Sequence, residues 1–249
     1  MHEHNALLIG ISGVSSSGKT TLARLLRDIF PNTFILHEDD FYKTDTDIPI
    51  NASAGNVADW DCLESLNLPA LENALNHIKL HGMPPQDLVS KEDKNDVGPC
   101  DVDRKVIDRL EWKASRWMFQ DVPPIAIIDG FLLYAEGMRA VRELFDVKLL
   151  LRTDFATGKA RREARQGYVT IEGYWEDPLG YWEKVVWTNY VEYHAFLFRD
   201  GDVEGELDQE VTGGLGIKAV PADVKDNMTA VLEWAYEVIE EALEPNKKR

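Results

Sequence analysis

The 249-residue sequence has few of the features typical of secreted or membrane proteins. Its two cysteines, Cys62 and Cys100, are too few for a disulfide framework and have no metal-binding spacing, so we expect reduced thiols. No apolar run reaches the roughly 18 residues that a membrane-spanning helix needs. The first four residues lead directly into an apolar run, which leaves no room for a signal peptide. We therefore expect a cytoplasmic protein that does not span a membrane.

The sequence also lacks positive charge, with a net charge of −17 and a pI near 4.7. Such a surface repels nucleic acid and anionic lipid, so neither is an expected partner. One segment, from Arg152 to Arg165, reverses this balance with five basic and two acidic residues. A local positive site of this kind is what an anionic ligand needs on an acidic protein. The sequence does not predict an oligomeric state.

Apolar runs alternate with amphipathic stretches along the chain, and 44% of the residues are hydrophobic. This alternation predicts an α/β fold with a doubly wound parallel sheet, formed by residues 1–249 as a single domain. The expected strands are 6–11, 34–37, 125–130, 147–151 and an edge strand at 216–220, and the main expected helices are 21–30, 68–78, 106–117, 182–193 and 224–239. Residues 82–122, rich in proline and charge, are expected to form a surface insertion, and residues 154–177 a lid.

The segment from Gly13 to Thr20 follows the phosphate-loop pattern of glycine, four free positions and then glycine-lysine-threonine. It lies between an apolar run and a helical stretch, which is the context that this motif requires. A helix that begins here directs backbone N–H groups and its positive dipole end at a phosphate. Lys19 would contact the outer phosphates and Thr20 would bind Mg²⁺. The predicted nucleotide-binding residues of this segment are Gly13, Val14, Ser15, Ser16, Ser17, Gly18, Lys19, Thr20 and Thr21.

Carboxylates lie at the carboxyl ends of two of the predicted strands. Asp39 and Asp40 come just after residues 34–37. A carboxylate there would accept the proton of an attacking hydroxyl or hold Mg²⁺ through water, and the alternative is that both side chains are simply solvated. Asp129 ends a continuous apolar run, as expected of a Mg²⁺-supporting residue, although Asp-Gly is also common in turns. Gly130 follows it where a motor ATPase would have an acid that activates water. The sequence also has no Asn-Lys-x-Asp for guanine, so it favours transfer to a small acceptor.

The basic segment contains Arg161, Arg162 and Arg165 at helical spacing, followed by Tyr168. Arginines three or four positions apart share a helix face and can close over phosphates. The alternative is a solvated basic face. The acidic background and the phosphate loop favour the lid interpretation.

Together these segments resemble the nicotinamide riboside kinase family, which is related to uridine and pantothenate kinases. The likeness covers about residues 6–195 apart from residues near 82–122. It is carried by Gly10-Ile11-Ser12-Gly13-Val14, Ser17-Gly18-Lys19-Thr20-Thr21, Asp39-Asp40-Phe41-Tyr42-Lys43, Trp60-Asp61, Glu64-Ser65-Leu66-Asn67, Ile128-Asp129-Gly130-Phe131-Leu132-Leu133, Arg161-Arg162, Arg165 and Tyr168. The phosphate loop alone indicates only nucleotide binding, whereas the Asp-Asp-Phe-Tyr-Lys and Trp-Asp blocks are much more specific.

The resemblance implies an ATP-dependent, Mg²⁺-dependent kinase that phosphorylates the 5′-hydroxyl of nicotinamide riboside. By this likeness Asp39 accepts the proton of the 5′-hydroxyl. Asp39 also contacts Mg²⁺, together with Thr20 and Asp129. The implied riboside-binding residues are Asp39, Asp40, Phe41, Tyr42, Trp60, Asp61, Arg162 and Tyr168, with Asp61 and Arg162 on the ribose hydroxyls and Trp60 and Tyr168 around the pyridine ring. Arg161 and Arg165 belong to the nucleotide side.

This chain departs from the family pattern in two places. The family often has glutamate where Asp129 stands, and one residue is inserted between Arg165 and Tyr168. A uridine or other nucleoside kinase, and a regulatory module that binds nucleotide without catalysis, remain alternatives. The choice between ATP and GTP and the acceptance of nicotinic acid riboside are open at this stage.

Overall fold

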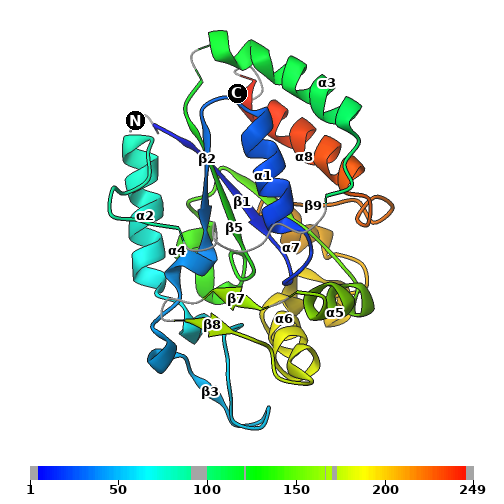
Figure 1. Ribbon diagram of the computed structural model, residues 1–249. Coiled ribbons are helices and arrows are strands. Elements are labelled where there is room, and N and C mark those ends of the chain that lie inside the picture. Colours follow the sequence, from blue (N-terminus) through cyan, green and yellow to red (C-terminus); the bar gives the residue numbers. More distant parts are fainter. Residues whose placement is uncertain (1–4, 91–99, 121, 166, 170–172, 245–249) are drawn as a thin grey trace.

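The computed structural model describes residues 5–90, 100–120, 122–165, 167–169 and 173–244 (Figure 1). Its strands are β1 (Leu7–Ser12), β2 (Thr33–His37), β3 (Ile50–Asn51), β4 (Val57–Ala58), β5 (Ile125–Gly130), β6 (Val147–Leu150), β7 (Tyr168–Val169), β8 (Tyr174–Trp175) and β9 (Ile217–Ala219). Its α-helices are α1 (Lys19–Ile29), α2 (Leu68–His81), α3 (Arg104–Ala114), α4 (Arg139–Arg142), α5 (Phe155–Glu163), α6 (Trp187–His194), α7 (Gln209–Gly214) and α8 (Met228–Leu243). Across the described ranges, no helix combines the length and apolarity needed to cross a membrane.

Five strands form one parallel sheet in the order β2-β5-β1-β6-β9. β1 is central and successive strands lie on both sides of it, as in a doubly wound sheet. The expected α/β class is therefore confirmed, and β9 occupies the predicted edge position. Because all five strands are parallel, their carboxyl ends share one edge of the sheet, where ligands bind in this class of fold.

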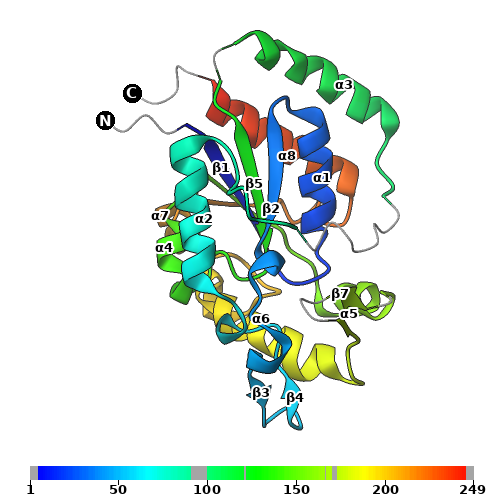
Figure 2. The same ribbon diagram turned by 60° about the vertical axis from the view of Figure 1, so that its left-hand side comes forward.

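Helices cover both faces of the sheet (Figure 2). Alternate residues of β1 point to opposite faces, so Ile9 packs in a core with α1, α3 and α8, while Leu8 belongs to the core that includes α2 and α6. The helix α8 begins after Asn227, whose side chain accepts hydrogen bonds from the backbone N–H groups of Thr229 and Ala230. Burial on both faces explains why β5 is apolar throughout, apart from its last two residues.

Part of the predicted surface insertion packs into the core. In residues 82–122, Leu110 and Ala114 of α3 and Trp117 just beyond it are at most 3% exposed, in the same apolar cluster as α1 and α8. The helix expected at 106–117 is therefore present as α3, but the proline-rich and charged flanks dominate the composition of this stretch and conceal that the helix packs into the core. Residues 91–99 of the expected insertion lie outside the described ranges.

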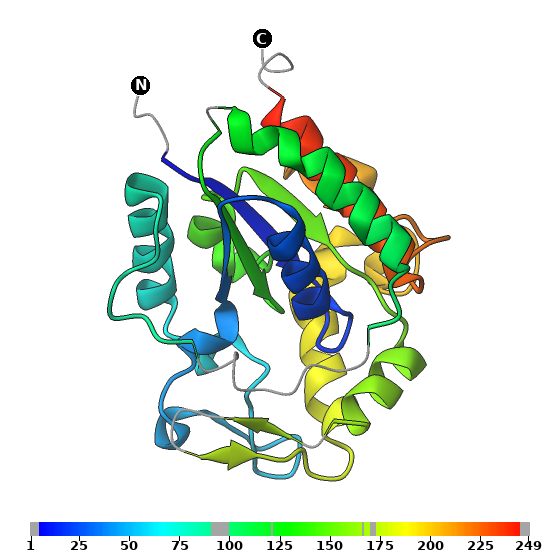
Figure 3. The ribbon, with the colours of Figure 1, turned by 45° about the horizontal axis from the view of Figure 1, so that its top comes forward.

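The predicted lid segment lies beyond the carboxyl ends of the central strands (Figure 3). It contains α5 and the two-stranded antiparallel hairpin of β7 and β8. The chain then continues through a π-helical turn, Trp182–Val186, into α6. This arrangement places the lid elements on the same side of the sheet as the segment from Gly13 to Thr20.

Candidate active site

The phosphate-loop segment makes a tight turn between β1 and α1. Gly13 has φ +142°, and a Cβ atom there would lie 2.3 Å from the carbonyl oxygen of Leu151, so only glycine fits. The carbonyl oxygen of Val14 accepts hydrogen bonds from the backbone N–H of Ser17 (3.2 Å) and from Nζ of Lys19 (2.9 Å). The sequence therefore forms the predicted loop, with Lys19 at its closing end.

This loop has the donor groups that a phosphate requires. The hydroxyl groups of Ser12, Ser16 and Ser17 are buried without a hydrogen-bond partner in the described part of the chain. Gly18 caps the N-terminus of α1 in a left-handed conformation, and Thr21 lies in the first turn. Unpaired buried hydroxyls are costly unless a ligand uses them, so this donor set fits nucleotide phosphates.

Lys19 and Asp129 form the charged centre of the site. Burial lowers the pKa of Lys19 to about 8, although Asp129 and Asp39 oppose this shift. Thr20 donates a hydrogen bond to Oδ2 of Asp129 (2.5 Å), and Nδ1 of His37 lies 2.5 Å from Oδ1. Burial opposes ionisation of Asp129, but these contacts with His37 and Thr20 and the charge of Lys19 lower its pKa overall. A hydroxyl beside an ionised carboxylate is a donor set that Mg²⁺ prefers.

The 3₁₀ turn η1 (Glu38–Phe41) follows β2 directly. The charge of Asp39 reaches Lys19, where it partly offsets the lowering of the pKa by burial. It also reaches Tyr42, whose phenol pKa is raised mainly by burial and additionally by Asp39. Asp40 is half-buried, whereas Phe41 is buried in the core with α2. The structure therefore brings Asp39 to the phosphate loop and directs Phe41 into the core.

Arg162 lies between two carboxylates that come from different parts of the chain. Its Nη1 and Nη2 donate to Asp61 at 3.1 and 3.2 Å, and its Nε and Nη2 donate to Asp177 at 2.6 and 3.1 Å. Burial raises the pKa of Asp61, and the Arg162 charge opposes this rise. Because both pairs are bidentate, the guanidinium group is fixed in one orientation. We call Asp61, Arg162 and Asp177 the arginine clamp.

Aromatic side chains lie next to the arginine clamp. Trp60 is 7% exposed, and its ring centroid is 5.2 Å from that of Tyr42 in an edge-to-face contact and 5.8 Å from that of Trp175. Tyr42 also stacks on Phe131 at 6.2 Å. Trp175 donates its indole N–H to Asp177 (2.9 Å), so the aromatic group and the clamp are connected.

The lid residues predicted from the sequence have different outcomes. The backbone of Tyr168 pairs with that of Trp175 in the hairpin, but the Tyr168 side chain lies outside what the structure describes. Arg161 is exposed on α5. Arg165 is also exposed but lies close enough to Lys19 to contribute to the lowering of its pKa. The basic segment is therefore near the phosphate loop through Arg165.

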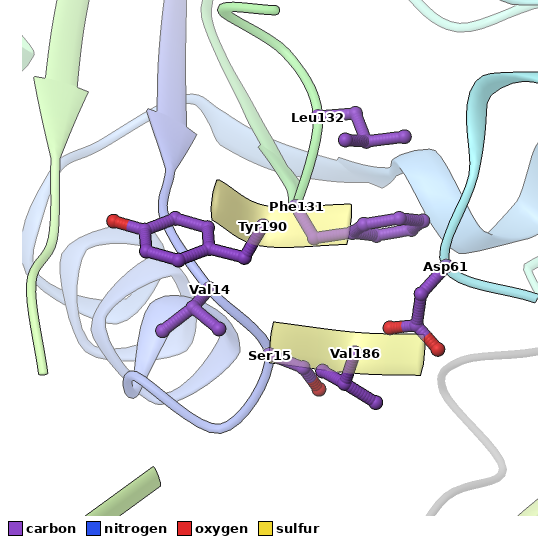
Figure 4. Close-up of a pocket in the computed structure, with 7 residues that line it drawn as sticks. All are labelled: Val14, Ser15, Asp61, Phe131, Leu132, Val186 and Tyr190. Atoms are coloured by element: carbon purple, nitrogen blue, oxygen red, sulfur yellow. The ribbon is translucent and has the colours of Figure 1, made fainter. Parts of the chain in front are cut away.

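A small, partly open cavity lies between the phosphate loop and the arginine clamp (Figure 4). Asp61 lies at one side of this cavity, with the Phe131 ring pointing toward it and Val14 on the other side. The residues that line it are Val14, Ser15, Asp61, Phe131, Leu132, Val186 and Tyr190. A ligand held by Asp61 would therefore be next to the loop that fits phosphates.

Sequence reasoning missed four residues of this site. His37 was expected in a strand, but its contact with Asp129 was not predicted. Glu38 and Trp175 were not predicted to belong to the site. Asp177 was only the boundary of the lid. The Glu38 carboxylate is buried, which raises its pKa to about 7, against the opposing hydrogen bonds from the Leu132 and Phe131 amides. Glu38 had one signal, since a glutamate directly after an apolar strand is at the edge where sites form.

Comparison with known proteins reveals close relatives along nearly the whole chain. The nicotinamide riboside kinase of Schizosaccharomyces pombe is 41% identical over 240 residues, which cover 96% of this chain and 98% of the relative. That of Saccharomyces cerevisiae is 33% identical and covers 96% and 98%. Human nicotinamide riboside kinase 1 is 27% identical over 75% of each chain.

No family model matches the sequence. Among solved structures, the thymidylate kinase of Candida albicans covers 96% of this chain and 94% of its own at 16% identity, with a TM-score of 0.39. That score is too low to add to what the sheet order shows directly. The identity with the two yeast enzymes over their full length is decisive, and the chain belongs to the nicotinamide riboside kinase family.

Proposed function

We propose that this protein transfers the γ-phosphoryl group of ATP to the 5′-hydroxyl of nicotinamide riboside and so forms nicotinamide mononucleotide for NAD synthesis. Family membership supports this activity. The observation that carries the proposal in the structure is the shared cavity, because Asp61 of the arginine clamp and Val14 and Ser15 of the phosphate loop line the same space. A single small ligand could therefore contact both the Asp61 carboxylate, through its hydroxyl groups, and the loop that binds phosphates.

On the riboside side, Asp61 and Arg162 bind the ribose hydroxyls. A carboxylate accepts hydrogen bonds from a diol and a guanidinium donates to it, so the buried pair supplies both functions. Trp60 provides an aromatic face for the pyridinium cation, with Tyr168 on the lid as its partner. Asp40, Phe41 and Tyr42 belong to the same side, with Phe41 acting from the core behind the pocket.

On the nucleotide side, residues Gly13 to Thr21 and Lys19 hold the phosphates, and Arg161 and Arg165 close over them. Thr20, Asp39 and Asp129 would hold Mg²⁺, and the oxygen donors at Thr20 and Asp129 fit that ion. An ion held there would supply positive charge against the phosphate oxygens. Asp39 accepts the proton of the 5′-hydroxyl, since it lies near Lys19 and follows the strand edge.

Residues 1–249 act as one kinase domain in this proposal, with residues 154–177 as the lid and the part of 82–122 that precedes α3 as a surface insertion. The partners are the riboside and the nucleoside triphosphate, with no nucleic acid or membrane, and the protein works in the cytoplasm. The acidic chain attracts a cationic riboside more than a neutral one, at a net charge of −17.

A riboside panel tests the proposal. The purified protein is incubated with Mg²⁺ and either ATP or GTP, together with nicotinamide riboside, nicotinic acid riboside or uridine, and the products are identified by mass. We expect nicotinamide mononucleotide to form with the highest kcat/KM. Faster formation of uridine monophosphate would identify a uridine kinase. Binding of ATP with no product from any riboside would identify a regulatory module.

A further inference from the structure

Glu38 is a fully buried carboxylate to which the proposed reaction gives no role. It is 0% exposed and lies between His37, the last residue of β2, and Asp39, the proposed proton acceptor. An acidic side chain in the interior is costly unless its oxygens are hydrogen-bonded. Its position next to the proposed base raises the question of what the carboxylate holds.

Its partners are two backbone amides just beyond β5. Oε2 of Glu38 accepts hydrogen bonds from the N–H of Phe131 (2.6 Å) and from the N–H of Leu132 (3.1 Å). Gly130 makes this approach possible, because a Cβ atom there would lie 2.6 Å from both Cβ and Oε2 of Glu38. Gly130 is therefore required for space, rather than for an unusual backbone angle.

This contact extends the pairing of two strands past the end of the sheet. The register of β2 with β5 ends at His37 and Asp129, and η1 begins at the next residue. Beyond that pair, the side chain of Glu38 makes the connection that the backbone no longer makes. Two segments that leave the sheet edge are thereby held at a fixed separation.

Each of these segments carries part of the site. The Glu38 segment carries Asp39, while the segment after β5 carries Phe131 and Leu132, which both line the cavity. Phe131 also stacks on Tyr42, so the two segments meet again at the aromatic group. A change in the separation between them moves the proposed base relative to the wall of the riboside pocket.

We propose that Glu38 is a positioning residue of the kinase reaction, which fixes Asp39 relative to the pocket wall at Phe131 and Leu132 by accepting both backbone amides. This assignment rests on the proposed function, because it needs a riboside in the cavity. In this assignment Glu38 acts through the two amides that its Oε2 accepts, and not as a group that reacts with a substrate. Small displacements of reacting groups cost about a hundredfold in rate, so such a residue has a measurable effect.

Three variants and a control test this role. Glu38→Ala removes the acceptor, Glu38→Gln keeps one acceptor oxygen for the amides, and Gly130→Ala keeps the carboxylate but occupies its space. The control, Glu237→Ala, removes an exposed glutamate on α8. Kinetic constants for riboside and for ATP are measured for each variant, along with thermal unfolding and the hydrogen exchange of the Phe131 and Leu132 amides.

We expect Glu38→Ala to lower kcat/KM for riboside by at least about tenfold, with the KM for ATP changed less than about threefold. Glu38→Gln should recover most of the loss, and Gly130→Ala should reproduce it although it removes no polar group. The two amides should exchange faster in Glu38→Ala and Gly130→Ala than in the wild type. Glu237→Ala should behave as the wild type in every measurement.

Equal losses for riboside and ATP, unchanged kinetics in Glu38→Ala, or a Glu38→Gln variant as impaired as Glu38→Ala would overturn the assignment. If Glu38→Ala does not fold, Glu38→Gln and Gly130→Ala decide it. The wild type alone tests the proposed function, and the variants are read relative to it. If the wild type phosphorylates another nucleoside, the same ratios are measured with that nucleoside, and amide exchange without substrate still tests the contact.

Discussion

Replacing Asp177 by asparagine tests the arginine clamp, since this residue was not expected from the sequence to contact Arg162. The substitution keeps the shape of the side chain but removes its charge from a bidentate pair with Nε and Nη2 of Arg162. Arg162 is 6% exposed and keeps its pair with Asp61, whereas the Asp177 side chain is 22% exposed. The guanidinium group therefore stays charged and buried but loses one of the two carboxylates that orient it.

The size of the effect follows from this burial. Removing one partner from a fully buried ion pair costs about 3–5 kcal/mol, but Asp177 is partly exposed and one pair remains, so we expect about 1–2 kcal/mol. If this loss appears in ribose binding, the KM for nicotinamide riboside rises by about five- to thirtyfold. The same loss in stability lowers Tm by about 2–8 °C in a protein of this length.

Steady-state kinetics with each substrate varied in turn, together with thermal unfolding, measure both effects. Asp28→Asn is the matched control, because Asp28 forms an exposed pair with Arg27 at 2.9 Å, with side chains 62% and 39% exposed. Loss of such a pair has little effect. The reasoning would be refuted if Asp177→Asn left the KM for riboside unchanged, or if it raised the KM for ATP by the same factor.

Further variants test other parts of the site and the core. Lys19→Ala should nearly abolish transfer while the protein stays folded, since it removes charge from the phosphates, and near-normal turnover would exclude the phosphate-loop assignment. Trp60→Ala should raise the KM for riboside roughly tenfold or more by removing a cation–π contact of about 1–2 kcal/mol, and an equal effect on ATP would make Trp60 structural. Asp39→Asn should lower kcat at least about a hundredfold, and Asp40→Asn much less, so a larger loss at Asp40 would identify the other carboxylate as the base. His194→Gln tests a buried imidazole, because burial lowers the pKa of His194 from about 6.5 in the unfolded chain to about 4 in the native state. As the pH falls from about 6.5 toward 4, the unfolded chain binds a proton that the native state does not, so the wild type loses stability. The Tm difference between wild type and this variant should therefore shrink as the pH falls from about 7 to 5, and a constant difference would contradict the shift.

Local sequence patterns predicted the elements that depend on local physics. The phosphate loop was found because its glycines and Lys19 must occur at fixed spacing, and Gly13 does lie against Leu151 where no Cβ fits. The run from Ile125 to Gly130 was identified as a buried strand because it is almost continuously apolar. It is apolar because both faces of the strand are covered. The amphipathic pattern of α8 was similarly clear, since one face of that helix packs on the sheet.

Contacts between distant segments could not be predicted in this way. The pairs of Arg162 with Asp61 and Asp177 depend on where the segment 154–177 packs relative to the sheet edge. His37 contacts Asp129 only because β2 pairs with β5. Composition was misleading between residues 82 and 122, where charged and proline-rich flanks conceal core residues such as Trp117.

The identity of the product tests the central claim most directly. The wild-type protein is incubated with ATP, Mg²⁺ and nicotinamide riboside, and the product is analysed by mass and by phosphorus NMR to locate the phosphate. The proposed function predicts stoichiometric conversion to nicotinamide mononucleotide, with the phosphate on the 5′-oxygen and ADP as co-product. ADP release without a phosphorylated riboside, or a phosphate on the 2′- or 3′-oxygen, would contradict it.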